Sequence, residues 1–147
     1  MHVEIGEGIR SILIVEDEGI VAILMEDLVR EMGIREIHMC TDVKSALEIA
    51  RTASIDCAVL DVWVRDGHTS DVADAPAERN VPFIFSTGTS AESLDERHRD
   101  RPMITKPFAD EDFKLILLDT VTLAHSGASQ PMARRGRPRV APFPATD

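Results

Sequence analysis

Acidic, hydroxyl and lysine side chains stand directly after short apolar runs of this chain. Glu16 and Asp17 follow one run, Asp61 follows a second, Thr87 a third and Lys106 a fourth. Grouped carboxylates repel one another unless a cation joins them, and Mg²⁺ prefers such hard oxygen ligands. A lysine and a hydroxyl beside them could stabilise an arriving phosphate anion. Together these residue types predict phosphoryl transfer to an aspartate.

Apolar runs alternate with segments of helical period, and these elements must position the candidate residues. The runs are short and continuous, as expected for strands buried on both faces of a sheet. Their alternation with helices predicts an α/β fold with a doubly wound, five-stranded parallel sheet. The carboxyl ends of such strands meet at one edge, so the candidate residues should gather there. We expect strands at 12–15, 37–40, 57–60, 81–85 and 103–105, and helices at 18–32, 43–50, 90–99 and 110–124.

Two stretches carry weaker patterns. Within residues 64–80, the segment 65–68 is turn-like and Pro76 is expected to limit any helix. The helix expected at 90–99 has only Ala91 and Leu94 as apolar anchors, so it should pack weakly.

Taken in order, the candidate residues resemble the receiver domain of two-component response regulators. The resemblance covers residues 9–125 and implies the flavodoxin-like receiver fold with strand order 2-1-3-4-5. Residues 82–88 are also similar to a motif of the Phe-Ala-Thr-Gly type found in stand-alone receivers from alphaproteobacteria. Ser86 stands here where that motif has alanine. The family positions are matched by Glu16-Asp17, Asp61, Thr87-Gly88 and Lys106-Pro107-Phe108.

The resemblance assigns a role to each candidate residue. Asp61 would be the phosphoacceptor, taking its phosphoryl group from a sensor histidine kinase or a histidine phosphotransfer protein. Asp17 and Asp61 would ligate Mg²⁺ directly, Glu16 would help, and the backbone carbonyl of Trp63 would be a further ligand. Lys106 would pair with the acceptor carboxylate and then with the phosphoryl group. Thr87 would turn toward that group and report its arrival to the last two helices.

Several of these residues also have plainer interpretations. Glu16 and Asp17 could simply stabilise the start of the following helix, as acids do, and Thr87 could be a turn former. Lys106 could be an ordinary surface residue. Trp63 could shield a phosphoaspartate from water or contact the kinase, or it could be a packing residue over its loop. Met103 stands where the family usually has an aromatic switch residue, so coupling by that residue is in doubt.

Composition narrows the class of protein. The chain has 147 residues and a formal net charge of −10, which argues against a general nucleic-acid binder. Its two cysteines, Cys40 and Cys57, lie in apolar stretches and are expected to be buried thiols in a reducing compartment. Neither a signal peptide nor a membrane-length apolar run is visible, so the expected location is cytoplasmic.

Charge and sequence pattern divide the chain into three parts. Residues 1–8 are interpreted as an N-terminal extension, 9–125 as the receiver domain and 126–147 as a basic, flexible tail. The tail carries the run Arg134 to Arg139, which resembles the core of an AT-hook, a peptide that binds the DNA minor groove. A solubilising tail, or one that folds back on the acidic domain, would equally account for this run.

The sequence therefore predicts a single-domain response regulator, a switch rather than an enzyme acting on outside substrates. Phosphorylated on Asp61 with Mg²⁺ as cofactor, it would signal through changed protein contacts or act as a phosphate shuttle or sink. Leu115 and Leu118 are a candidate face for a downstream protein. The alternatives are a receiver-like binding module that works without phosphorylation and a DNA-associated regulator acting through Arg134–Arg139.

Overall fold

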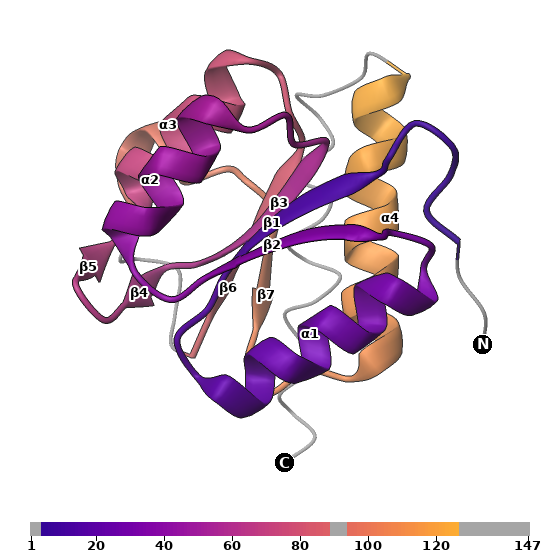
Figure 1. The fold of residues 1–147 in the computed structure, drawn as a ribbon, viewed down its shortest axis with the longest axis horizontal. Coiled ribbons are helices and arrows are strands. Elements are labelled where there is room, and N and C mark those ends of the chain that lie inside the picture. Colours follow the sequence, from indigo (N-terminus) through magenta and orange to yellow (C-terminus); the bar gives the residue numbers. More distant parts are fainter. Residues whose placement is uncertain (1–3, 89–93, 127–147) are drawn as a thin grey trace.

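A computed structural model describes residues 4–88 and 94–126 of the chain. Its centre is a parallel sheet of five strands in the order β2-β1-β3-β6-β7 (Figure 1). Because β4 and β5 pair only with each other, this order is the predicted 2-1-3-4-5, which is confirmed. The strands of the sheet are β1 (Ser11–Val15), β2 (Glu36–Cys40), β3 (Cys57–Asp61), β6 (Phe83–Thr87) and β7 (Met103–Thr105).

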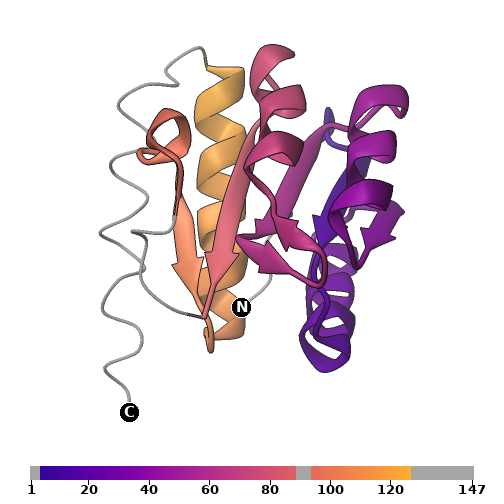
Figure 2. The same ribbon diagram turned by 90° about the vertical axis from the view of Figure 1, so that its left-hand side faces the viewer.

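Helices cover both faces of the sheet, so the central strands β1 and β3 are buried along their whole length. Helices α1 (Gly19–Glu31) and α4 (Asp110–His125) lie on one face, and α2 (Val43–Thr52) and α3 (Ser70–Glu78) on the other (Figures 1 and 2). Alternate residues of each strand face opposite layers. In β1, Ile12 and Ile14 join the core under α1 and α4, and Leu13 joins the core under α2 and α3.

Residues 62–80 differ from the expectation. A hairpin of β4 (Trp63–Val64) and β5 (Gly67–His68) follows β3 directly, and α3 runs through Pro76. The prediction that Pro76 limits the helix is wrong. Proline removes only one helical hydrogen bond, the one to the carbonyl of Val72, and the buried Pro76 ring packs in the protein interior. Gly67, with φ of +146°, supplies the backbone angle that closes the hairpin.

Residues 94–99 are also less helical than predicted. Residues 89–93 lie outside the described part, and residues 94–99 contain one 3₁₀ turn, η2 (Glu96–His98), in place of the expected α-helix. Leu94 is buried, as an apolar anchor should be. Side-chain contacts with α3 hold the turn: Arg97 pairs with Asp74 at 2.8 Å, and the buried His98 ring meets the same carboxylate at 2.8 Å.

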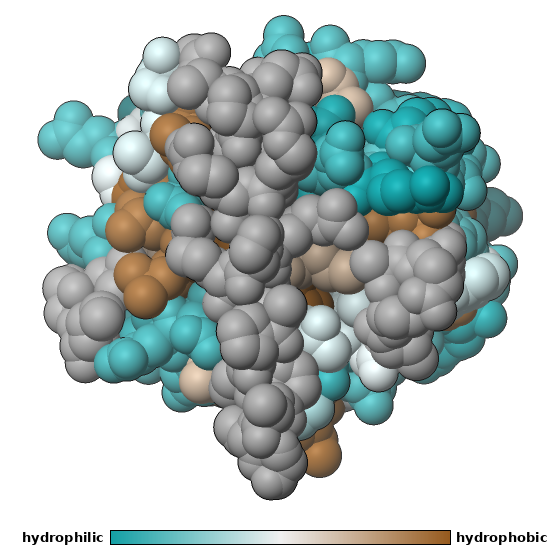
Figure 3. All heavy atoms as spheres, turned by 180° about the vertical axis from the view of Figure 1, so that it is seen from behind, coloured by the Kyte–Doolittle hydropathy of each residue, from teal (hydrophilic) through white to brown (hydrophobic). Residues whose placement is uncertain are grey.

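The described part of the N-terminal extension is packed against the domain. Ile5 is buried in the core beside α1, and its N–H donates to the carbonyl of Met32 at 2.9 Å. The tail at 127–147, including the arginine run, lies outside the described residues. Apolar residues are visible from behind on the side where α4 lies (Figure 3), and Leu115 of this helix is 42% exposed. Leu118 instead packs partly into the core. Among the described helices, none is long and apolar enough to span a membrane.

Candidate functional site

The parallel sheet brings all the predicted site residues to one edge, because its strands end there together (Figure 2). Asp61 and Thr87 are the last residues of β3 and β6. Glu16 and Asp17 follow β1, and Lys106 follows β7. The N–H of Lys106 donates to the carbonyl of Thr87 at 2.7 Å, which extends the pairing of β6 and β7 to the site itself.

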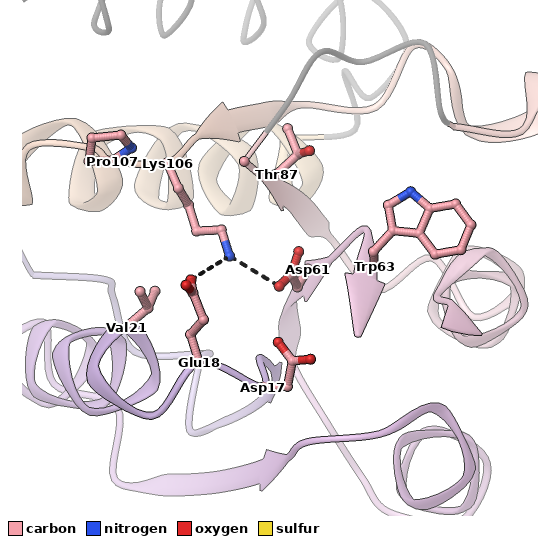
Figure 4. Close-up of a pocket in the computed structure, with 9 residues that line it drawn as sticks. Asp17, Glu18, Val21, Asp61, Trp63, Thr87, Lys106 and Pro107 are labelled. Atoms are coloured by element: carbon pink, nitrogen blue, oxygen red, sulfur yellow. Dashed lines mark hydrogen bonds and ion pairs between the residues drawn. The ribbon is translucent and has the colours of Figure 1, made fainter. Parts of the chain in front are cut away.

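These strand ends surround an open pocket of about 650 Å³ (Figure 4). Seven of the nine lining residues were singled out from the sequence, and only Glu18 and Val21 were not assigned there. The lining consists of Asp17, Glu18, Val21, Asp61, Trp63, Thr87, Gly88, Lys106 and Pro107. Glu16 lies beneath them and is fully buried.

Lys106 is the cationic centre of the site. Its Nζ donates to Asp61 at 3.1 Å and to Glu18 at 3.2 Å (Figure 4). It also donates to both carboxylate oxygens of Glu16, at 3.2 and 3.3 Å. The interpretation of Lys106 as an ordinary surface residue is therefore wrong. Pairing with Glu18 was not assigned from sequence, although Glu18 also follows β1 and so could have been suspected.

Burial and charge shift the acid–base properties of this group of residues. Burial raises the pKa of Glu16 to about 7, although the N–H of Glu18 and the ammonium of Lys106 act in the opposite direction. Burial also raises the pKa of Asp61, against the lowering effect of Lys106. Burial opposes the charge on Lys106, but Asp61 and Glu16 outweigh that effect and hold the pKa of Lys106 above its ordinary value. The site therefore carries an excess of carboxylate that one lysine only partly neutralises.

The carboxylates of the pocket could bind a divalent cation. Oxygen atoms of Glu16, Asp17 and Asp61 lie within 4.8 Å of one another, and carboxylate oxygens are the donors that Mg²⁺ prefers. Glu16 also accepts the N–H of Glu18 at 2.9 Å, which makes the start of α1 part of the same cluster. The donor set is thus suited to a hard cation.

Trp63 stands at the rim of the pocket with its side chain 55% exposed. Its ring meets the ring of His68 edge-on, with centroids 4.7 Å apart. The aromatic side chain therefore both lines the pocket and packs on the hairpin, and its role toward a phosphoaspartate or a kinase stays a prediction. Met103 is buried in the core under α2 and α3.

A second contact at the site, made by Thr69, was not predicted from the sequence. Thr69 is fully buried, and its hydroxyl donates to the backbone carbonyl of Asp61 at 2.7 Å. Threonine in a polar loop gives no signal of such a bond, because its partner lies eight residues away and the loop path decides whether they meet.

Comparison with known proteins identifies the family that the fold resembles. Residues 12–118 match the response regulator receiver domain family. The solution structure of SdrG from Sphingomonas melonis Fr1 is 38% identical with a TM-score of 0.66, and the match covers 77% of this chain and 98% of SdrG. The PhyR stress response regulator is 30% identical with a TM-score of 0.63, over 78% of this chain and 45% of PhyR.

A curated relative extends further than this chain. The transcriptional regulatory protein PdtaR of Mycobacterium tuberculosis is 30% identical over 122 residues, which are 80% of this chain and 57% of PdtaR. This chain therefore spans little more than half the length of that relative. The SdrG match, which spans nearly the whole of that protein, supports the predicted similarity to the stand-alone alphaproteobacterial subgroup.

Proposed function

This chain belongs to the family of response regulator receiver domains, and we propose that it is a Mg²⁺-dependent phosphorylation switch with Asp61 as the phosphoacceptor. The observation that carries the proposal is the contact of Lys106 with Asp61 at 3.1 Å beside two further carboxylates. This arrangement joins a nucleophilic carboxylate, a fixed cation and a set of metal donors in one open pocket.

The reaction proposed is transfer of a phosphoryl group from a phosphohistidine to Asp61. A carboxylate oxygen of Asp61 bonds to phosphorus while the phosphorus–nitrogen bond of the donor breaks. The electron pair of the broken bond stays on the histidine nitrogen. Lys106 neutralises the charge on the group in transfer and then pairs with the phosphoaspartate.

Glu16, Asp17 and Asp61 would hold Mg²⁺, with the carbonyl of Trp63 as a further ligand proposed from the family. When bound, the ion supplies positive charge that offsets the negative charge of the phosphoryl oxygens. Thr87, the last residue of β6, lines the same pocket and is proposed to hydrogen-bond the phosphoryl group. In this role it would carry the signal from the pocket toward β7 and α4.

The donor is proposed to be a sensor histidine kinase or a histidine phosphotransfer protein, as the family implies. We propose a signalling switch rather than an enzyme for outside substrates. A phosphatase with an aspartate nucleophile usually needs a second aspartate two residues later as general acid, and Trp63 occupies that position. Output would then come from changed protein contacts or from passing the phosphoryl group on, and the exposed Leu115 on α4 is one surface available for contact.

Intact mass spectrometry tests the proposal directly. The full chain is incubated with Mg²⁺ and acetyl phosphate, with Asp61→Asn as the control. We expect the mass of one phosphoryl group on the wild type only, and its loss when a chelator replaces Mg²⁺. SdrG has a BeF3-activated conformation, so BeF3 binding to the wild type but not to Asp61→Asn is a second expected result. An unmodified wild type with every donor would refute the phosphoacceptor role and favour a receiver-like module that works without phosphorylation.

A further inference from the structure

The loop that follows Asp61 is closed on itself by one buried residue, Thr69. Its hydroxyl donates to the carbonyl of Asp61 at 2.7 Å and approaches the carbonyl of Val62 at 3.3 Å. Its N–H donates to the same Val62 carbonyl at 3.0 Å. Across the sheet, the N–H of Val62 donates to the carbonyl of Ser86 at 2.9 Å. The peptide unit that leaves Asp61 is therefore held from two sides.

The segment enclosed by these bonds is the hairpin of β4 and β5, which begins with Trp63. The hairpin has its own attachments. His68 Nδ1 accepts the N–H of Ser70, the first residue of α3, at 3.1 Å. Asp66 accepts the N–H of Val43, the first residue of α2, at 2.6 Å. The hairpin is thus fastened to the starts of two helices, and Thr69 fastens its base to Asp61.

We propose that Thr69 is a positioning residue for phosphoryl transfer, which acts by holding the backbone of Asp61 and the hairpin that carries Trp63. This inference rests on the proposed function. Thr69 touches no substrate. It controls the direction in which the Asp61 side chain leaves the strand and the place of the Trp63 carbonyl relative to that side chain. Reaction rates respond strongly to such placement, because a misplacement of about 1 Å can cost about a hundredfold in rate.

A purely structural role for Thr69 can be distinguished from a positioning role, because the chain contains a second buried threonine with a similar hydrogen bond. Thr120 on α4 is also buried, and its hydroxyl donates to the carbonyl of Ile116 at the same distance of 2.7 Å. Removing either hydroxyl leaves a buried carbonyl with one hydrogen bond fewer, so both changes should lower stability. Only the change at Thr69 alters the surroundings of Asp61.

The test compares full-length wild type with Thr69→Val, Thr69→Ser and Thr120→Val, at a temperature where circular dichroism shows every protein folded. Acetyl phosphate is the donor, and intact mass gives the phosphorylation rate over a range of donor concentrations at saturating Mg²⁺. Mg²⁺ affinity is measured from the fluorescence of Trp63, the one tryptophan of the chain. If the valine variant does not fold, Thr69→Ala replaces it.

We expect Thr69→Val to lower the maximal phosphorylation rate about tenfold. The acetyl phosphate concentration that gives the half-maximal rate should change little. Thr69→Ser keeps the hydroxyl and should stay within about twofold of wild type, as should Thr120→Val despite its lower Tm. A wild-type rate in Thr69→Val, or equal slowing in Thr120→Val, would overturn the positioning role. A wild type that accepts no phosphoryl group would refute the proposed function instead. Because Thr69 is proposed to place the Asp61 side chain and the Trp63 carbonyl, both suggested Mg²⁺ ligands, Thr69→Val should also bind Mg²⁺ more weakly. If the wild type is not phosphorylated, an unchanged Mg²⁺ affinity in Thr69→Val would overturn this inference as well.

Discussion

Replacing the buried Glu16 with glutamine should stabilise the metal-free protein at alkaline pH and weaken its affinity for Mg²⁺. Glu16 is fully buried, and this burial raises its pKa from the ordinary value of 4.5 to about 7. Glutamine has nearly the shape of the protonated side chain but cannot ionise. The substitution therefore removes the cost of holding a buried negative charge while keeping the packing.

The sign and size of the effect follow from proton linkage. The unfolded chain loses the Glu16 proton near pH 4.5, whereas the folded protein keeps it until about pH 7. Between these values the folded state binds more protons, so stability falls as pH rises and the loss is complete above pH 7. A gap of about 2.5 pH units corresponds to about 3 kcal/mol in the free energy of unfolding.

Urea unfolding in the presence of a chelator measures this difference at about pH 5 and about pH 8.5. Glu16→Gln should be only slightly more stable than wild type at the lower pH and more stable by about 3 kcal/mol at the higher pH. Asp61 and Lys106 titrate in contact with Glu16, so the difference includes the effect of the Glu16 charge on these two neighbours. Glu48→Gln, the same change at an exposed position on α2, is the control and should have little effect. Adding Mg²⁺ should stabilise wild type more than Glu16→Gln.

Parallel pH profiles for wild type and Glu16→Gln would refute this reasoning, since the buried charge would then carry no measurable cost. Equal stabilisation of both proteins by Mg²⁺ would show that Glu16 does not contribute to the metal site.

Other parts of the structure give further expectations. Ser86→Ala should raise the free energy of unfolding by about 1 kcal/mol in urea titrations, because the buried Ser86 hydroxyl has no hydrogen-bond partner among the described residues; a loss of stability would contradict this. Asp42→Ala and Asp66→Ala each remove a side-chain acceptor from the start of α2, so each should lower the Tm in thermal unfolding. Only Asp66→Ala should also weaken Mg²⁺ binding in Trp63 fluorescence titrations, and equal Mg²⁺ affinities would argue that the hairpin is held without Asp66. Burial raises the pKa of the Cys57 thiol, so iodoacetamide should label Cys57 only on unfolding, and fast labelling of the native protein, detected by peptide mass, would contradict its burial.

Several features could be predicted from sequence because they depend on short-range patterns. Continuous apolar runs marked the strands of the sheet, and their alternation with helices implied a parallel order. Parallel strands end at one edge, so residues as distant in the chain as Asp61 and Lys106 could be placed together without knowledge of any loop. The contact between them, at 3.1 Å across 45 residues, agrees with that argument.

Loops and segment ends could not be predicted in the same way. Pro76 lies inside α3 although proline usually ends a helix, because burial of its ring offsets one lost hydrogen bond. Ile5 is part of the core although it precedes the periodic pattern. In both cases the stabilisation comes from contacts with residues distant in the chain. Local propensity does not include such contacts.

The chemistry of the site could be predicted from residue order alone: which carboxylates, which lysine and which hydroxyl stand at the strand ends. How these groups interact depends on the folded chain. It brought Glu18 to Lys106 and buried Glu16 deeply enough to raise its pKa. It also placed the hydroxyl of Thr69 on the carbonyl of Asp61. Strand ends follow from a repeating backbone geometry, whereas hydrogen bonds across loops and the cost of burying a charge depend on how the whole chain packs.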